Sequence, residues 1–518
     1  MKNLKKATIK KGGRKMSARS LYVKELNWKV ILPTPIAYYL VSKVEEEVPF
    51  KNFKPEIALY FLSLISSIPT RKKDQQYFQN YIPLASQNLR KISRNYNLYF
   101  NYFLKIEIIK KRNYDNRRNQ CNRYRYNWAK INELGSIPIS AEYFSFPRGS
   151  ISIGSEQIAK VNRAVESCPH LVQWFDHGLH IDYERFLEEN TNIFTVNKYS
   201  DEDVQDADYQ KARNFYYSAF EFSEQNFRVS RDIKSDYRLH TNLTNLSKRI
   251  RNYIYYQNEN IIGLDIKNSQ PYFLILMIEK ILKEPLKVDL KGNEGDRIGR
   301  IGRRIYRGTW STILHTLSEY ASDRAFAEEF EKIKEAVLSG RYYEFLADVF
   351  DDIKPSTDQY GNEFYSGRFY NANREITETK YYKTKRDLMK KVSMQLLYTP
   401  LTKPSEYYKK FKQTFPMLCG FMEILKTSPN SKDSYKKFPK LLQHYEAECV
   451  LDFVTKRIAE KYPDMPIFTV HDSIATTWFW FDELHDSVAE LMIEFSDGMP
   501  PNFEKQEWND RPVYIPAA

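Results

Sequence analysis

Residues 467–478 read IFTVHDSIATTW, which is two apolar and β-branched runs separated by His471, Asp472 and Ser473. This pattern predicts a strand, a tight turn and a second strand. Asp472 then lies at the tip of a hairpin, where Asn-Gly or Asp-Gly would be expected for stability alone. A His-Asp pair at this position therefore points to a chemical role for Asp472.

A second aspartate occupies a comparable place earlier in the chain. Residues 261–266, IIGLDI, predict a short buried strand, and Ser269-Gln270-Pro271 predicts the start of a helix. Asp265 therefore ends a strand just before a helix, where a lone aspartate is usually a cap or turn residue. Paired with Asp472 on a neighbouring strand, it could instead help to hold two Mg²⁺ ions for phosphoryl transfer.

A predicted helix, residues 384–398, lies between the two aspartates in the sequence. Arg386, Lys390, Met394 and Tyr398 recur every four residues on it and so form one slanting stripe. Two cations at the start of the stripe could bind a triphosphate, and the thioether and phenol could line a base or sugar. The alternative is an ordinary amphipathic helix with a solvated basic end.

Together these segments resemble the palm and fingers of family-A DNA polymerases and single-subunit RNA polymerases. Leu264-Asp265 with Ser269-Gln270 is similar to motif A, the Arg386 to Tyr398 stripe to motif B, and Thr469-Val470-His471-Asp472-Ser473 to motif C. Tyr237-Arg238-Leu239-His240-Thr241, with Asn245-Leu246, resembles an upstream element that contacts primer and template. The resemblance covers residues 235–485. It implies an α/β fold: a right-hand polymerase with an antiparallel palm sheet, helical fingers and a helical N-terminal or thumb region.

The resemblance also implies a role for each matching residue. Asp265 and Asp472 would be the metal ligands, with two Mg²⁺ ions, or Mn²⁺, as cofactors. Lys390 would join them as a catalytic residue by protonating the pyrophosphate. The nucleotide would be bound by Arg386, Lys390, Met394, Tyr398 and Gln270. The nucleic acid would be bound by Arg238, His240, Asn245 and His471. Gln443 and Glu446, before motif C, are more simply interpreted as ordinary helix residues.

The motifs depart from the family patterns in ways that leave the sugar choice open. Three residues separate Asp265 from Ser269-Gln270, and Thr399-Pro400 follows Tyr398 where Gly is common. Met394 and Ser473 are of the residue types that resemble the corresponding motif positions of the single-subunit RNA polymerases. Gln270, five residues after Asp265, falls where DNA polymerases place the group that screens the ribose 2′-OH.

The sequence thus predicts a template-directed nucleotidyltransferase, with DNA synthesis favoured and with no proofreading exonuclease. The alternatives are a single-subunit RNA polymerase or primase, and a template-independent transferase. An alternative of another class is an inactive palm that serves as a nucleic-acid-binding scaffold. The expected partners are a DNA or RNA template and primer and nucleoside triphosphates, and an accessory protein could bind the N-terminal region.

Composition agrees with a polyanionic partner. The 518 residues carry a formal net charge of +13. The 39 Tyr and 32 Phe residues interleave with Arg, Lys and Asn, as in residues 94–100 and 112–126, a pattern suited to stacking on unpaired bases. An AT-rich genome would produce the same enrichment without selection. The four cysteines are scattered, so no zinc site is expected.

The predicted organisation has five parts. Residues 1–20 form a flexible basic arm, 21–230 a mostly helical thumb-like region, 231–280 the first part of the palm, 281–400 the fingers, and 401–518 the second part of the palm. Within the fingers, a polar loop with Pro355, Gly361 and Gly367 precedes the motif B helix. The longest apolar run is too short for a membrane span and no secretory signal is present. A cytoplasmic protein of phage, plasmid or bacterial type is therefore expected.

Overall fold

The fold was analysed in a computed structural model of the chain, which describes residues 28–47, 49–71, 81–113, 121–127, 130, 141–146, 155–194, 207–283, 297–371, 376–427 and 434–509. The basic arm predicted for residues 1–20 lies outside them. The chain forms two compact units. The first unit comprises Met1–Arg231, His240–Asn260 and Trp508–Ala518, and the second Asp232–Leu239 and Ile261–Glu507.

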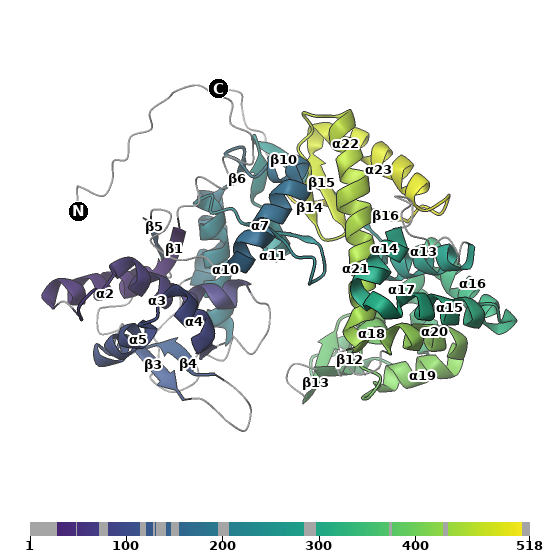
Figure 1. Ribbon diagram of the computed structural model, residues 1–518, viewed down its shortest axis with the longest axis horizontal. Helices are drawn as coiled ribbons and strands as arrows, with labels where there is room; N and C mark the ends of the chain where they lie inside the picture. Colours follow the sequence, from purple (N-terminus) through teal and green to yellow (C-terminus); the bar gives the residue numbers. More distant parts are fainter. Residues whose placement is uncertain are drawn as a thin grey trace. The chain divides into compact units, whose positions relative to one another are not determined.

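Both units are of mixed α/β type, and each strand pairing with a defined register is antiparallel in the described part of the chain (Figure 1). The subdomain ranges expected from the sequence stay predictions. None of the helices in the described ranges combines the length and the apolar character that a membrane span needs.

Helices predominate in the first unit, as expected, but short strands accompany them. An aromatic cluster that includes Phe61, Phe100 and Tyr124 fills one part of its core. The elements are β1 (Trp28–Pro33), α2 (Thr34–Glu46), α3 (Pro55–Arg71), β2 (Ile82–Pro83), α4 (Ser86–Ile92), α5 (Tyr96–Lys105), β3 (Ile109–Arg112), β4 (Arg123–Tyr126), β5 (Ala141–Phe146), α7 (Ser155–Ser167), α8 (Pro169–Val172), β6 (Leu179–Ile181), α9 (Tyr183–Phe194), α10 (Ala207–Ser223), β7 (Val229–Arg231), α11 (Asn242–Asn245), α12 (Lys248–Arg251) and β9 (Ile254–Tyr256).

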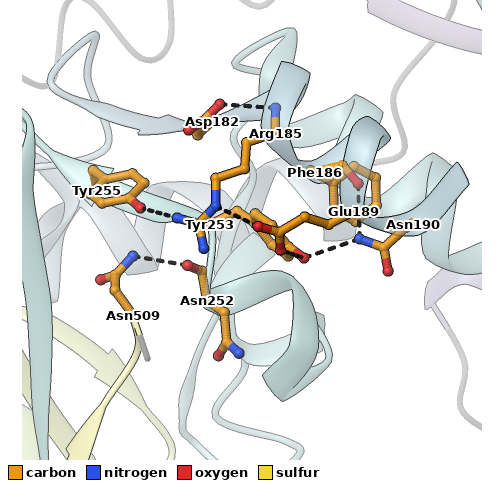
Figure 2. A network of polar contacts seen from close by, with 9 residues as sticks. All are labelled: Asp182, Arg185, Phe186, Glu189, Asn190, Asn252, Tyr253, Tyr255 and Asn509. Carbon is orange, nitrogen blue, oxygen red and sulfur yellow. Dashed lines mark hydrogen bonds and ion pairs between the residues drawn. The ribbon is translucent and has the colours of Figure 1, made fainter. Parts of the chain in front are cut away.

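A polar network ties α9 to β9 within the first unit (Figure 2). The Arg185 guanidinium donates to Glu189 and, over 2.9 Å, to the hydroxyl of Tyr255. Tyr253 donates to Glu189 over 2.7 Å, and the Asn509 amide donates to the carbonyl of Asn252 over 3.0 Å. Residues far apart in the sequence therefore close this unit, including Asn509, which follows the last strand of the second unit.

The second unit is built around a long helical segment, residues 437–461. Helices α13, α14, α18 and α20 each contact its first part, α21 (Figure 1). The helices are α13 (Ser269–Lys283), α14 (Arg297–Tyr306), α15 (Trp310–Ala321), α16 (Arg324–Leu338), α17 (Tyr342–Val349), α18 (Lys385–Tyr398), α19 (Glu406–Thr414), α20 (Pro416–Lys426), α21 (Lys437–Ala447), a π-helical segment (Glu448–Val454), α22 (Thr455–Lys461) and α23 (Phe481–Phe495).

The sheet of the second unit confirms the strands predicted around both aspartates. β14 (Phe468–Val470) and β15 (Ser473–Thr477) form a hairpin whose two turn residues are His471 and Asp472. β15 also pairs with β10 (Glu259–Ile266), and β16 (Phe503–Glu507) pairs with the other edge of β10. Since β10 is the central strand here, its end is fixed from both sides.

The predicted polar loop before α18 is wrong. A three-stranded sheet occupies this region, formed by β11 (Ser356–Thr357), β12 (Glu363–Asn371) and β13 (Ile376–Tyr382). Gly367 lies in β12, where an added Cβ would come within 2.6 Å of Leu388 Cδ1 in α18. The glycine that suggested a loop therefore lets the strand pack closely against the helix, and the fingers region is not wholly helical.

Candidate active site

Strand pairing places Asp265 and Asp472 at the same end of the sheet. Asp265 is opposite Ser473 in the β10–β15 register, so Asp472 is one residue beyond its partner. His471, the first turn residue, has a φ of 60°, a backbone conformation that costs free energy for a residue with a Cβ. Backbone strain thus accompanies the turn that carries Asp472.

Negative charge and burial both act on Asp472. Burial raises the pKa of its carboxyl group well above the usual range, and the negative charges of Glu446 and Asp265 raise this pKa further. The Arg238 guanidinium opposes the shift. Additional positive charge beside Asp472 would therefore be stabilising.

Glu446 is the centre of the polar contacts around these carboxylates. It lies on α21 and is only 1% exposed. Its Oε1 accepts from Arg238 Nε over 2.6 Å, and its Oε2 accepts from Ser269 Oγ over 2.7 Å and from Gln270 Nε2 over 2.5 Å. The sequence interpretation of Glu446 as an ordinary helix residue is wrong, because this carboxylate joins Arg238 to the start of α13.

Gln270 also links α13 to α18. The Tyr398 hydroxyl donates to Gln270 Oε1 over 3.1 Å and accepts from Gln443 Nε2 over 3.2 Å. Burial raises the pKa of Tyr398 to about 12, so the phenol is neutral at physiological pH. Gln443, also expected to be an ordinary helix residue, is thus part of this network.

The segment that carries Arg238 is fastened to α21. His444 Nε2 is 2.9 Å from the carbonyl oxygen of Ser235, and Lys440 Nζ donates to the carbonyl of Lys234 over 3.0 Å. The rings of Tyr237 and His444 stack with centroids 5.2 Å apart. These contacts fix the approach of Arg238 to Glu446. Burial alone would lower the pKa of Arg238, but the charges of Glu446 and Asp472 raise it overall.

Two other predicted nucleic-acid contacts belong to the first unit. His240 is on β8 (Leu239–Thr241), and the exposed Asn245 ends α11. The contacts described around Glu446 include neither residue. Their expected role stays a prediction.

On α18 the predicted stripe follows the open side of the helix. Arg386 Nε donates to Glu344 Oε1 over 2.8 Å, Lys390 lies 3.7 Å from Asp387, and Met394 is 40% exposed. The buried side consists of Leu388, Met389, Val392, Ser393, Leu396 and Leu397. Lys391 lies off the stripe, with its ammonium 6.0 Å from the Phe369 ring centroid, and burial and the charge of Lys380 lower its pKa.

Tyr343, on α17, is a site residue that the sequence did not indicate. The Arg386 guanidinium lies 5.3 Å from its ring centroid. Burial raises the pKa of Tyr343 to about 12; the charge of Asp472, and less strongly that of Asp265, raises it too, while Arg386 lowers it. Tyr343 is therefore close enough to interact electrostatically with both aspartates and with the first cation of the stripe.

The two aspartates fit Mg²⁺ only as part of a larger coordination shell. In the described ranges, no three His, Cys, Asp or Glu side chains are grouped so as to hold a metal ion. Mg²⁺ is commonly bound through one or two carboxylates, with water and substrate phosphates completing its octahedron. Asp265 and Asp472 are two carboxylates at the same end of the sheet, and the raised pKa of Asp472 shows that its charged form is disfavoured there.

Comparisons with known proteins add little. No protein-family model and no curated protein matches the sequence. One similar solved structure is the polymerase domain of Pol1 from M. smegmatis in complex with DNA primer-template and dNTP, at 12% identity and a TM-score of 0.24. The match covers 63% of this chain and 55% of that chain, so it spans about half of that domain. A TM-score this low does not establish a shared fold.

Proposed function

We propose that this chain is a template-directed nucleic-acid polymerase that transfers nucleotides with the help of two Mg²⁺ ions. The observation that carries the proposal is the placement of Asp265 near the end of β10 and of Asp472 in the turn that leads into the paired strand β15. Bound there, two Mg²⁺ ions would stabilise negative charge on the attacking and leaving oxygens of phosphoryl transfer. In this proposal the second unit supplies palm and fingers of a right-hand polymerase.

The side chains of α18 would bind the incoming triphosphate. Lys390 is exposed and paired only loosely with Asp387, so it can turn to a phosphate at small cost. Lys390 can also donate a proton to the departing pyrophosphate. Arg386 is half-exposed and would exchange Glu344 for a phosphate oxygen, while stacking on Tyr343 keeps its guanidinium near the carboxylates.

DNA synthesis is the favoured reaction because of Gln270. Its amide is held between Glu446 and Tyr398, and a side chain fixed beside the sugar would exclude a 2′-hydroxyl. RNA synthesis or priming, suggested by Met394 and Ser473, is the second candidate, and template-independent transfer is a third. His471 would contact the primer end and Arg238 the nucleic-acid backbone.

A palm that binds nucleic acid without catalysis is the candidate of another class. Loss of the aspartates or of the α18 cations would be expected in such a scaffold. Asp265, Asp472, Arg386 and Lys390 are all present, and their partial exposure leaves them accessible to substrate. The proposal is therefore for an active enzyme.

Primer extension tests the function directly. The protein should extend a primer on a DNA or RNA template with dNTPs or NTPs when Mg²⁺ is present, and EDTA should stop it. Asp265→Asn and Asp472→Asn should each reduce the rate by more than about tenfold, since metal charge stabilisation contributes several kcal/mol. Nucleic-acid binding should survive, because cations elsewhere dominate it.

The exposed Asp464 provides a matched control on the same unit. Asp464→Asn removes the same charge outside the site and should leave extension within about twofold of wild type. A substantial rate in either site variant, or an equal loss in the control, would refute the metal assignment. Absence of extension under every combination of template, primer and nucleotide would favour the scaffold.

A further inference from the structure

A small sheet in the first unit has two chemically different faces. Its strand order is β2-β4-β3. Ile109, Tyr124 and Tyr126 are buried in the core of the unit, so alternation along β3 and β4 places their neighbours on the opposite face. That face carries four cations, here called the cationic face: Lys110, Arg112, Arg123 and Arg125.

The register sets like charges directly against each other. Lys110 is opposite Arg125, and Arg112 is opposite Arg123. Like charges at directly opposed positions destabilise a sheet. Strands β2, β3 and β4 contain no Asp or Glu, and in the described ranges no ion pair joins Lys110, Arg112 or Arg123 to an acid. Packing gives no reason for this arrangement.

An aromatic ring organises two of these cations. The guanidinium carbons of Arg112 and Arg125 lie 4.3 Å and 4.8 Å from the ring centroid of Tyr81, which immediately precedes β2. Stacking on a ring fixes the plane of a guanidinium while leaving its N–H groups able to donate within that plane. The two arginines are therefore held in orientation before any ligand binds.

We propose that the cationic face binds the phosphodiester backbone of a nucleic-acid strand. The four cations form an array of roughly 5 Å by 7 Å, from the spacing of neighbouring strands and of residues two apart along a strand. Closely spaced positive charges suit a linear polyanion, and oriented guanidiniums suit phosphate oxygens. The proposal concerns the first unit and does not depend on the polymerase chemistry of the second.

Salt-dependent binding to the full-length protein tests the cationic face. The affinity for an oligodeoxythymidine and for the matching RNA is measured between about 50 and 200 mM salt. The triple variant Lys110→Gln, Arg112→Gln, Arg123→Gln should flatten the slope of log K against log salt by about 2, at about 0.7 per phosphate on a single strand. That difference corresponds to roughly 100-fold weaker binding near 0.1 M salt.

A second triple variant removes three exposed cations elsewhere: Lys51→Gln, Arg90→Gln and Lys332→Gln. It has the same net charge as the first and should change the slope by less than about 0.5, if scattered cations make few phosphate contacts. Equal changes of the slope in the two triple variants would mean that the cationic face contributes only as general surface charge, and would overturn the proposal. If the cationic-face triple loses affinity for DNA alone or for RNA alone, that result would identify the backbone that the cationic face prefers and would support the proposal.

Two further measurements separate binding from folding. Because opposed like charges are relieved, the cationic-face triple should melt at the wild-type temperature or above it. Tyr81→Leu keeps every charge but removes the ring beneath the two guanidiniums, and should weaken binding by about threefold to tenfold. A lower melting temperature for the triple, or wild-type binding by Tyr81→Leu, would contradict the proposed arrangement. Extension activity of the second unit is scored separately, so either proposal can fail alone.

Discussion

Gln270 shows how one buried carboxylate can determine the orientation of a neighbouring amide. Glu446 Oε2 accepts a hydrogen bond from Gln270 Nε2, so the Gln270 NH₂ faces this carboxylate. The Gln270 oxygen is then left to accept from Tyr398. Because Gln270 is itself only 7% exposed, the amide has one orientation that satisfies both neighbours.

Gln270→Gly should raise ribonucleotide incorporation relative to deoxynucleotide incorporation by about tenfold. The reason is that removal of a side chain beside the sugar relieves a misfit worth about 1–3 kcal/mol. Single-nucleotide incorporation with matched dNTP and NTP measures the ratio. Tyr272→Phe is the control, since the Tyr272 hydroxyl donates to the carbonyl of Met499 and the ring is buried. An unchanged ratio in Gln270→Gly would exclude Gln270 from sugar selection.

The sequence predicted that Asp265 ends a strand and that Asp472 lies in a hairpin turn, but it did not predict the residues around them. Asp265 and Asp472 follow strand patterns that are local, so a short window contains the information. The partners of Glu446 are 176 to 208 residues away along the chain, and no spacing on α21 distinguishes it from a solvated glutamate. Tyr343 was missed for the same reason.

Helix α18 divides its lysines between two faces. Lys390 is on the open stripe, whereas Lys391 packs against Phe369 of β12. The difference of one residue turns a side chain by about 100° around the helix axis. Adjacent lysines of the same type thus have different neighbours, which makes them a matched pair for substitution.

Lys390→Ala should lower kcat/KM for the incoming nucleotide by about tenfold or more, because a cation that contacts phosphate is lost. Lys391→Ala should change kcat/KM by less than about threefold, with its effect appearing in the melting temperature through lost packing on Phe369. Steady-state extension kinetics and thermal denaturation of both variants give the comparison. Similar kinetic losses from the two alanines would mean that α18 presents a general basic face.

At the element scale, long helices and apolar strands were predictable, and the hairpin β12–β13 was not. The helix predicted at residues 384–398 is α18, which begins one residue later. The hairpin was missed because its strands are rich in charged residues and because Gly367 resembles a loop signal. The close approach of Leu388 that requires this glycine comes from a different element.

Each of the two units is made of segments that are not contiguous in the sequence. His240–Asn260 belongs to the first unit, although it lies between two segments of the second. In this part β9 pairs with β6, and Tyr253, Ile254, Tyr255 and Tyr256 are each at most 7% exposed. A change of sequence character near residue 235 was recognisable, but the return to the first unit was not, since β6 and β9 are three residues long.

A fragment of residues 232–507 should therefore aggregate, because β9 would lose its pairing with β6 and its buried aromatic residues would be exposed. A second fragment, in which a flexible Gly/Ser linker replaces residues 240–260, should be soluble and monomeric. Size-exclusion chromatography with light scattering compares the two. Identical behaviour of the fragments would contradict the assignment of residues 240–260 to the first unit.

The place of Trp508 and Asn509 in the first unit has a consequence for folding during synthesis. The Asn509 amide donates to the carbonyls of Asn252 and Ile254, and Arg251 lies over the Trp508 ring at 5.5 Å from its centroid. On the ribosome these two residues emerge only after every residue of the second unit has been made. Although N-terminal domains usually finish folding first, here the unit that begins the chain is completed last. In a nascent chain, all residues of the second unit would therefore have been made before the first unit can form its contacts with Trp508 and Asn509.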